Sequence, residues 1–465
     1  MRRLPRWSIA ALVAITVLGG ALRFDAAGDP GQYHSRDAIA YSMIARGIVD
    51  KGTYGLLGGG GHGQQDPMHW PPGTPALFAL AHAIDPGAVT NDGAVTAAFP
   101  WQAAVGTLTI VATFALVVLV AGPAAALLAA LLVALYPPLV AASGDLLSEP
   151  LGSLLLTAAL AATVLTMRRP TRTAGAVAGL LLTATVLTRA DLLLVPLVAL
   201  IAIAAVTRSR RAVAPVLAAL VVVLTPWTIF ASGVAGHLVP LSSGGASNLW
   251  VGTYLPGDGS IFGSKRALAP EVKRLYPRLR DHRPDQISEV HVIRTVAARH
   301  PGLSEEQALR RETLVNLREY ALGQPGPFAG MLASKVWRLW GSYTHGTYQR
   351  TRGPIRALHL ALLAFGLAGL AAGLVATRRA ELWTVAALLL LLTAMNAVLV
   401  SEARHNLTVM PVLIAGGGMG FRLAAGRLRR PPRLEVPEGD HVIVAAVHPA
   451  RRPQTAPAVS PLPPG

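Results

Sequence analysis

The chain of 465 residues contains no cysteine, and charged residues make up only 14% of it. The absence of cysteine excludes disulfide bonds, thiolate metal sites and cysteine nucleophiles. So small a charged fraction is rare in soluble domains, and here it accompanies a hydrophobic content of 52%. The composition therefore predicts a protein that lies largely within a membrane.

Acidic residues are also scarce relative to basic ones. The chain has 41 Lys and Arg against 24 Asp and Glu, which gives a net charge of +17. Most of the excess lies in short clusters beside apolar runs, a pattern that indicates anionic lipid headgroups and membrane topology. We therefore expect membrane lipids as partners and no nucleic acid.

About ten apolar stretches approach the roughly 17 to 25 residues that are needed to cross about 30 Å of hydrocarbon. They predict an all-α polytopic membrane protein with about ten transmembrane helices, and up to twelve. If the spans alternate in direction, basic pairs such as Arg168-Arg169 and Arg378-Arg379 all fall on the side of the N-terminus. We therefore expect a multi-pass protein of the cell (plasma or inner) membrane with both termini in the cytoplasm. The predicted spans are residues 7–22, 101–120, 122–140, 150–167, 174–188, 191–207, 212–231, 354–377, 383–400 and 406–422.

The spacing of the spans also predicts how the chain is divided. Residues 1–231 are expected to form an N-terminal transmembrane module whose first external loop covers 23–100. Residues 232–353 would form a small external domain, and 354–422 the C-terminal transmembrane helices. The Pro-rich, basic segment 423–465 is expected to be cytoplasmic and largely disordered.

The first external loop begins with an amphipathic pattern. Asp37, Tyr41, Ile44 and Ala45 recur at a helical spacing and share one face, as in a short helix suited to the membrane interface. In one interpretation Asp37 only caps this helix or faces water. Spacing alone does not decide between this interpretation and a functional role.

The pattern D-x-x-x-Y-x-x-I-A-R at 37–46, followed by HWPPGTP at 69–75, resembles the first external segment of the GT-C membrane glycosyltransferases. More specifically, it is similar to glycosyltransferase family 39, which includes protein O-mannosyltransferases and the aminoarabinose transferases of lipid A. The resemblance implies a GT-C-like bundle with external juxtamembrane helices. It also implies a catalytic role for Asp37, with Tyr41, Arg46, Pro71 and Pro72 in support.

A second acidic segment, YPPLVAASGDLLSEPLGSLLL at 136–156, resembles the second external loop of the family. Asp145 and Glu149 lie at a span end, where an ionisable group is costly, and we therefore treat both as catalytic candidates. The alternative is a plain helix start, in which Ser148 caps, Glu149 favours the helix dipole and Pro150 occupies the first turn.

Two further segments, VLTRADLLLVPL at 186–197 and SEARHNLTVMPVLIAGGG at 401–418, resemble family turns that carry basic residues. Arg189, Arg404 and His405 fall at the external ends of spans. A guanidinium there can hold phosphate oxygens bidentately, so we predict that these residues bind the phosphate of a lipid-linked sugar donor. The alternative is ordinary snorkelling of Arg toward headgroups.

Together, the resemblances imply a glycosyltransferase of hexosyl or pentosyl units in the cell envelope. It would move a sugar from a polyprenyl-phosphate donor to a hydroxyl of a lipid, glycan or protein acceptor on the external face. Asp37 would take the hydroxyl proton as general base. Attack opposite the departing phosphate would invert the anomeric carbon.

Two questions stay open at this point. A divalent cation is possible, because Asp37 with Glu149 or Asp145 offers the carboxylates that hard cations prefer. Several family members carry a second acid beside the first, whereas Arg36 and Ala38 flank Asp37 here, which weakens the case for a metal-binding role of Asp37.

The alternative function is a flippase or transporter of a lipid-linked sugar, which predicts charged groups near the bilayer midplane. A metal site built from histidines is not expected, because the histidines of the predicted external segments are scattered along the sequence. They are His62, His69, His237 and His345.

Overall fold

The structure is a computed structural model, and it describes residues 4–28, 36–56, 67–342 and 353–428. Within these residues the secondary structure is helical, with one isolated bridge between Val89 and Val95 and no strand. This confirms the predicted all-α fold. Residues 423–465 were expected to be largely disordered, but 423–428 continue the helix Met410–Leu428. The rest of that tail, together with His62 and His345, lies outside the described residues.

The described helices confirm a multi-pass membrane protein. Seven of the described helices are long and apolar enough to cross a membrane. A bent pair, α5 (Pro123–Leu135) with α6 (Pro137–Ala141), brings the number of candidate spans to eight if the pair forms one span. Two more helices, α8 (Arg172–Thr188) and α18 (Met410–Leu428), match the two remaining predicted spans. Each of the ten predicted stretches therefore coincides with a helix or with the bent pair. The seven are α1 (Arg6–Gly28), α4 (Phe99–Ala121), α7 (Glu149–Arg168), α9 (Val195–Thr207) with the turn before it, α10 (Arg210–Ala235), α16 (Gly353–Ala376) and α17 (Ala380–Val398).

The bend of 59° between α5 and α6 has an identifiable cause. Pro137 and Pro138 have no N–H groups to donate to the carbonyls of Val133 and Ala134, four residues earlier. Arg23 of α1 is buried beside these two carbonyls, and its guanidinium donates to them at 2.9 and 3.0 Å. A buried charge in a membrane helix thus replaces the hydrogen bonds that the prolines remove.

Glycine sets the closest helix contacts in the bundle. α16 and α18 lie side by side, and the backbone of Gly369 on α16 touches Gly417 and Gly420 on α18. α8 packs against α10 in the same way, at Gly175 and Gly179. Small residues at such crossings allow dispersion contacts between backbones, which is how helices associate in lipid.

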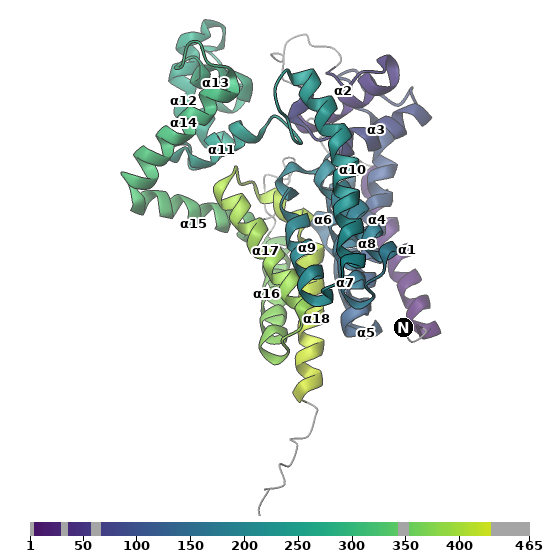
Figure 1. The fold of residues 1–465 in the computed structure, drawn as a ribbon. Coiled ribbons are helices and arrows are strands. Elements are labelled where there is room, and N and C mark those ends of the chain that lie inside the picture. The colour runs from purple at the N-terminus through teal and green to yellow at the C-terminus, as the bar shows by residue number, and fades with distance from the viewer. Residues whose placement is uncertain (1–3, 29–35, 57–66, 343–352, 429–465) are drawn as a thin grey trace, which may run out of the picture.

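The described part of the segment between α1 and α4 folds onto one end of the bundle, above α4. Its helices are α2 (Arg36–Lys51) and α3 (Gly73–Ile84), near the top of Figure 1. The predicted apolar face of α2 is present, since Tyr41, Ile44 and Ala45 are all buried. It packs on protein, with the Tyr41 ring edge-on to Phe78 of α3 at 6.2 Å, rather than on lipid as the pattern predicted.

A second helical segment, between α10 and α16, lies to one side of the bundle (Figure 1). Its buried cluster is centred on Trp250, with Val272 and Val292. Its helical run from Glu305 is broken at Gly323 and Gln324, because Pro325 starts a new helix. The segment comprises α11 (Gly245–Thr253), α12 (Ile261–Leu275), α13 (Glu289–Ala297), α14 (Glu305–Asn316), η8 (Leu317–Leu322) and α15 (Pro325–Gly341).

Candidate functional site

A cavity of about 390 Å³ opens where the segment with α2 and α3 and the segment with α11 to α15 meet the ends of the membrane helices. Its walls come from the start of α2, the start of α7, the turn after α8, the loop before α11 and η9 (Ala403–Thr408). Among the described residues, acidic and arginine side chains line the cavity. They are Asp37, Glu149, Asp191, Glu289, Glu402, Arg189 and Arg404.

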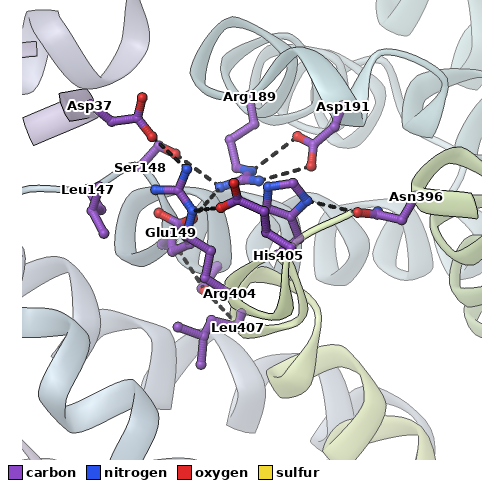
Figure 2. Close-up of polar contacts among 12 residues, drawn as sticks. Asp37, Leu147, Ser148, Glu149, Arg189, Asp191, Asn396, Arg404, His405 and Leu407 are labelled. Carbon is purple, nitrogen blue, oxygen red and sulfur yellow. Dashed lines mark hydrogen bonds and ion pairs between the residues drawn. The ribbon is translucent and has the colours of Figure 1, made fainter. Parts of the chain in front are cut away.

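Asp37 lies in the first turn of α2, beside Arg404 (Figure 2), and has two hydrogen-bond partners. Its Oδ2 accepts from Nη2 of Arg404 at 2.6 Å, and its Oδ1 accepts from Nε1 of Trp70 at 3.3 Å. Burial alone would raise the pKa of this carboxyl, but Arg404 and the Trp70 bond outweigh it and lower the pKa to about 2. Asp37 is therefore ionised and already paired.

Arg189 is the most enclosed cation of the site, with its side chain 7% exposed. Its Nε and Nη2 donate to the two carboxylate oxygens of Asp191 at 3.1 and 2.9 Å. Its Nη1 donates to Oγ of Ser148 at 3.0 Å and lies 3.1 Å from Oε1 of Glu149. Burial would lower the pKa of Arg189, but Asp191 and Glu149 raise it, so the guanidinium stays charged.

These contacts correct one prediction about the start of α7. Ser148 does precede the helix and Pro150 does occupy its first turn, but the Ser148 side chain makes no capping bond. Its hydroxyl accepts from Arg189 instead. The residue thus supports the arginine rather than the helix end.

Arg404 lies on η9, within reach of three carboxylates. Its Nε donates to Oε2 of Glu402 at 2.7 Å and lies 3.7 Å from Oε1 of Glu149, while Nη2 holds Asp37. Glu149 therefore stands between the two guanidinium groups, as Figure 2 shows.

The cluster as a whole is acidic. Two guanidinium groups, of Arg189 and Arg404, face four carboxylates, so the formal charge is −2 when all of them are ionised. His405 adds little positive charge, because burial and then Arg189 lower its pKa. Its Nδ1 donates to Oδ1 of Asn396 at 2.8 Å.

The remaining predicted residues fall in different places. Tyr41 and Pro71 line the cavity, and Pro72 precedes α3. Asp145 is buried in the turn before α7 and is not among the described residues that line the cavity; its carbonyl accepts from Gln102. Arg46 faces Asp50 one turn along α2, with Nε 3.8 Å from the carboxylate.

Several members of the site were not predicted from the sequence. They share one function, which is to hold a predicted residue by a hydrogen bond. A local signal was available for two of them, because an acid stands two residues after Arg189 and another two residues before Arg404. These members are Trp70, Ser148, Asp191, Asn396 and Glu402.

The donor set does not suit a divalent cation in this arrangement. The described residues contain no group of three or more His, Asp or Glu placed to hold a metal ion. Asp37 and Glu149, the predicted ligands, both face guanidinium groups. No chemical step is therefore assigned to a metal.

No protein-family model and no curated protein sequence matches the chain. Among solved structures, it is similar to the oligosaccharyltransferase AglB of the archaeon Archaeoglobus fulgidus in complex with an inhibitory peptide and a dolichol-phosphate. The identity is 15% and the TM-score 0.49, over 89% of this chain and 50% of that one. A second structure of that enzyme, in complex with Zn and sulfate, has 15% identity and a TM-score of 0.41, over 90% of this chain and 50% of the other.

The chain is also similar to ArnT from Cupriavidus metallidurans bound to undecaprenyl phosphate, at 15% identity and a TM-score of 0.39, over 90% of this chain and 79% of that one. AglB and ArnT are both GT-C glycosyltransferases, the class that the sequence motifs resemble. The chain spans about half the length of the oligosaccharyltransferase. The function proposed below is drawn from the geometry of the site.

Proposed function

We propose that this chain is a membrane glycosyltransferase that moves a sugar from a polyprenyl-phosphate donor to an acceptor hydroxyl. The observation that carries the proposal is the contact between Asp37 and Arg404 inside the cavity. It sets a carboxylate that can take a proton beside a guanidinium that can hold a phosphate. Inverting transfer of a sugar from a phosphate requires this pair of groups.

The reaction would proceed by a single displacement. The acceptor oxygen attacks the anomeric carbon, and its proton passes to the carboxylate of Asp37. The bond from that carbon to the phosphate oxygen breaks, and its electron pair stays on the phosphate. Arg404, with Arg189 behind it, stabilises the charge that develops there. Attack opposite the leaving group inverts the anomeric carbon.

The placement of charge along α7 supports an external active site. Glu149 begins this helix in the cavity, and Arg168 ends it, paired with Glu381 at 2.7 Å. A helix of this length separates the two ends by about 30 Å, the thickness of the hydrocarbon core. If the basic end faces the cytoplasm, as positive charge near short loops favours, the cavity faces outward.

A flippase remains the second candidate, and one observation speaks against it. Such a protein needs charged groups along a path through the bilayer. Arg23 is a buried charge on a described span, and the carbonyls at the α5–α6 bend occupy its guanidinium. We therefore favour chemistry at the surface over passage through the bundle.

The test is transfer of a labelled sugar from a panel of polyprenyl-phosphate donors by the purified protein in lipid. Asp37→Asn keeps the shape of the side chain but cannot accept the proton, so turnover should fall by roughly 10²-fold or more. Asp50→Asn is the matched control, because Asp50 lies on the same helix and faces His82. Full activity of Asp37→Asn would remove Asp37 as the base. Movement of donor lipid across vesicles without transfer would favour the flippase.

A further inference from the structure

Two carboxylates hold different edges of the Arg404 guanidinium. Glu402 accepts from Nε at 2.7 Å and belongs to the same turn of chain, two residues away. Asp37 accepts from Nη2 at 2.6 Å and comes from α2, 367 residues away. The Nε edge is thus anchored locally, whereas the Nη2 edge depends on a contact between distant parts of the fold.

Of the two arginines, Arg404 is the more accessible to a ligand in the cavity. The side chains of Arg404 and Asp37 are 21% and 26% exposed, whereas that of Arg189 is 7% exposed. Arg189 already has Asp191, Ser148 and Glu149 around it. A phosphate that enters the cavity therefore has readier access to Arg404 than to Arg189, and Asp37 holds one of the donors of Arg404.

We infer that the donor phosphate displaces Asp37 from Arg404, so that binding of the donor releases the catalytic base. Glu402 keeps its hold on Nε throughout, and the guanidinium changes partner only at Nη2. This inference rests on the proposed function. It gives the enzyme an order of events, because the base is occupied until a donor is in place.

The exchange is physically balanced. One charge-assisted hydrogen bond, from Nη2 to a carboxylate, is replaced by another, from Nη2 to a phosphate oxygen. Once released, Asp37 loses the partner that opposes the effect of burial, so its pKa rises and it becomes a stronger base. The Trp70 bond to its other oxygen keeps the side chain in place.

Linkage makes the exchange measurable. If Asp37 and phosphate compete for Arg404, the Asp37 pair weakens phosphate binding, and its removal must tighten binding by the same coupling factor. We would measure binding of a polyprenyl monophosphate to the full-length protein in phosphatidylcholine nanodiscs. Asp37→Asn should tighten binding by about 5-fold or more, the lower end of such couplings. Arg404→Gln should weaken it.

The double variant separates exchange from simple charge repulsion. In an Arg404→Gln background there is no shared cation, so Asp37→Asn should change the affinity little. Equal tightening in both backgrounds would mean repulsion between Asp37 and phosphate, and would overturn the exchange. Glu289→Gln removes another carboxylate that lines the cavity. It should leave the affinity nearly unchanged, and tightening equal to that of Asp37→Asn would also overturn the exchange.

A second measurement uses the unmutated protein, in case Arg404→Gln does not fold. The pH profile of kcat/KM reports the free enzyme, and that of kcat reports the complex with substrate. Because donor binding raises the pKa of Asp37, kcat should begin to fall at a higher pH than kcat/KM. Coincident acid limbs would overturn the exchange. If the wild type neither binds a polyprenyl phosphate nor transfers sugar, the proposed function fails; if it does both without coupling, only the exchange fails.

Discussion

Gly152 on α7 lies directly against the stem of Arg189. A Cβ at this position would stand 2.8 Å from Cδ of Arg189 and 3.3 Å from Cγ2 of Thr408. The site therefore depends on a residue that carries no functional group. The absence of a side chain at Gly152 leaves the space in which the buried arginine reaches Asp191, Ser148 and Glu149.

Gly152→Ala should therefore displace Arg189 and weaken donor binding. Overpacking of a tight interior costs about 1–3 kcal/mol of stability. We would measure the melting temperature and the affinity for a polyprenyl monophosphate. Gly233→Ala on α10 is the matched control, because a Cβ there meets nothing within 4 Å. A Gly152→Ala protein with wild-type stability and affinity would contradict the role given to this contact.

Gln102 on α4 should prove important for the geometry of the site although it does not line the cavity among the described residues. Its Nε2 donates to the carbonyls of Asp145 at 3.2 Å and Leu147 at 2.6 Å, in the turn that leads to Glu149. Gln102→Leu keeps the bulk but leaves both buried carbonyls without this donor, at about 1–3 kcal/mol each. We expect a lower melting temperature and reduced transfer. Unchanged activity would show that the turn holds its shape without Gln102.

Arg23→Leu should destabilise the bundle at the α5–α6 bend. The carbonyls of Val133 and Ala134 would lose the donors that replace the missing N–H groups of Pro137 and Pro138. Adding Pro137→Ala and Pro138→Ala to Arg23→Leu restores those N–H groups, so the triple variant should recover much of the melting temperature. If the triple variant melts no higher than Arg23→Leu alone, the arginine has another function.

Lys335 on α15 should make stability depend on pH. The residue is buried, and its Nζ donates to the carbonyl of Gly252 at 2.8 Å. Burial, and then the charge of Arg338, lower the pKa of Lys335 to about 7 from 10.5. Between these two values the unfolded chain binds more protons than the folded one, so stability rises with pH across this window.

Lys335→Met provides the comparison, since it removes the titrating group and keeps the length of the side chain. The melting temperature of the wild type should rise relative to that of Lys335→Met between pH 7 and about 10. Other titrating groups affect both proteins alike, so the difference isolates Lys335. Parallel curves would show that Lys335 keeps an ordinary pKa.

The membrane helices could be predicted because lipid leaves the backbone little choice. A long apolar run in hydrocarbon must satisfy its own N–H and C=O groups, and a helix does this within one segment. The bend at Pro137 and Pro138 was not predicted, because residues 122–140 were expected to form one continuous span. What the sequence did not show is that Arg23, 110 residues or more before the bend, supplies the missing donors.

The site was predicted residue by residue but not as a set of pairs. Asp37 stood out in an amphipathic pattern that resembles a family motif, and Glu149, Arg189 and Arg404 stood out as charges at span ends. The structure brings all four into one cavity. Asp145 stood out equally, but it lies in the turn before α7 and is not among the described residues that line the cavity. The two acids are only four residues apart, and the sequence did not show that Glu149, and not Asp145, lines the cavity.

The sequence by itself determined that this protein is a bundle of apolar helices with acids and arginines concentrated at their ends, because hydrophobic length and charge position are local properties. Only the tertiary structure decided which acid meets which arginine. The contact of Asp37 with Arg404 joins α2 to η9, and that of Glu149 with Arg189 joins α7 to the turn after α8. Such pairs depend on how the helices pack, and the close backbone contacts of glycines such as Gly175 and Gly369 contribute to that packing.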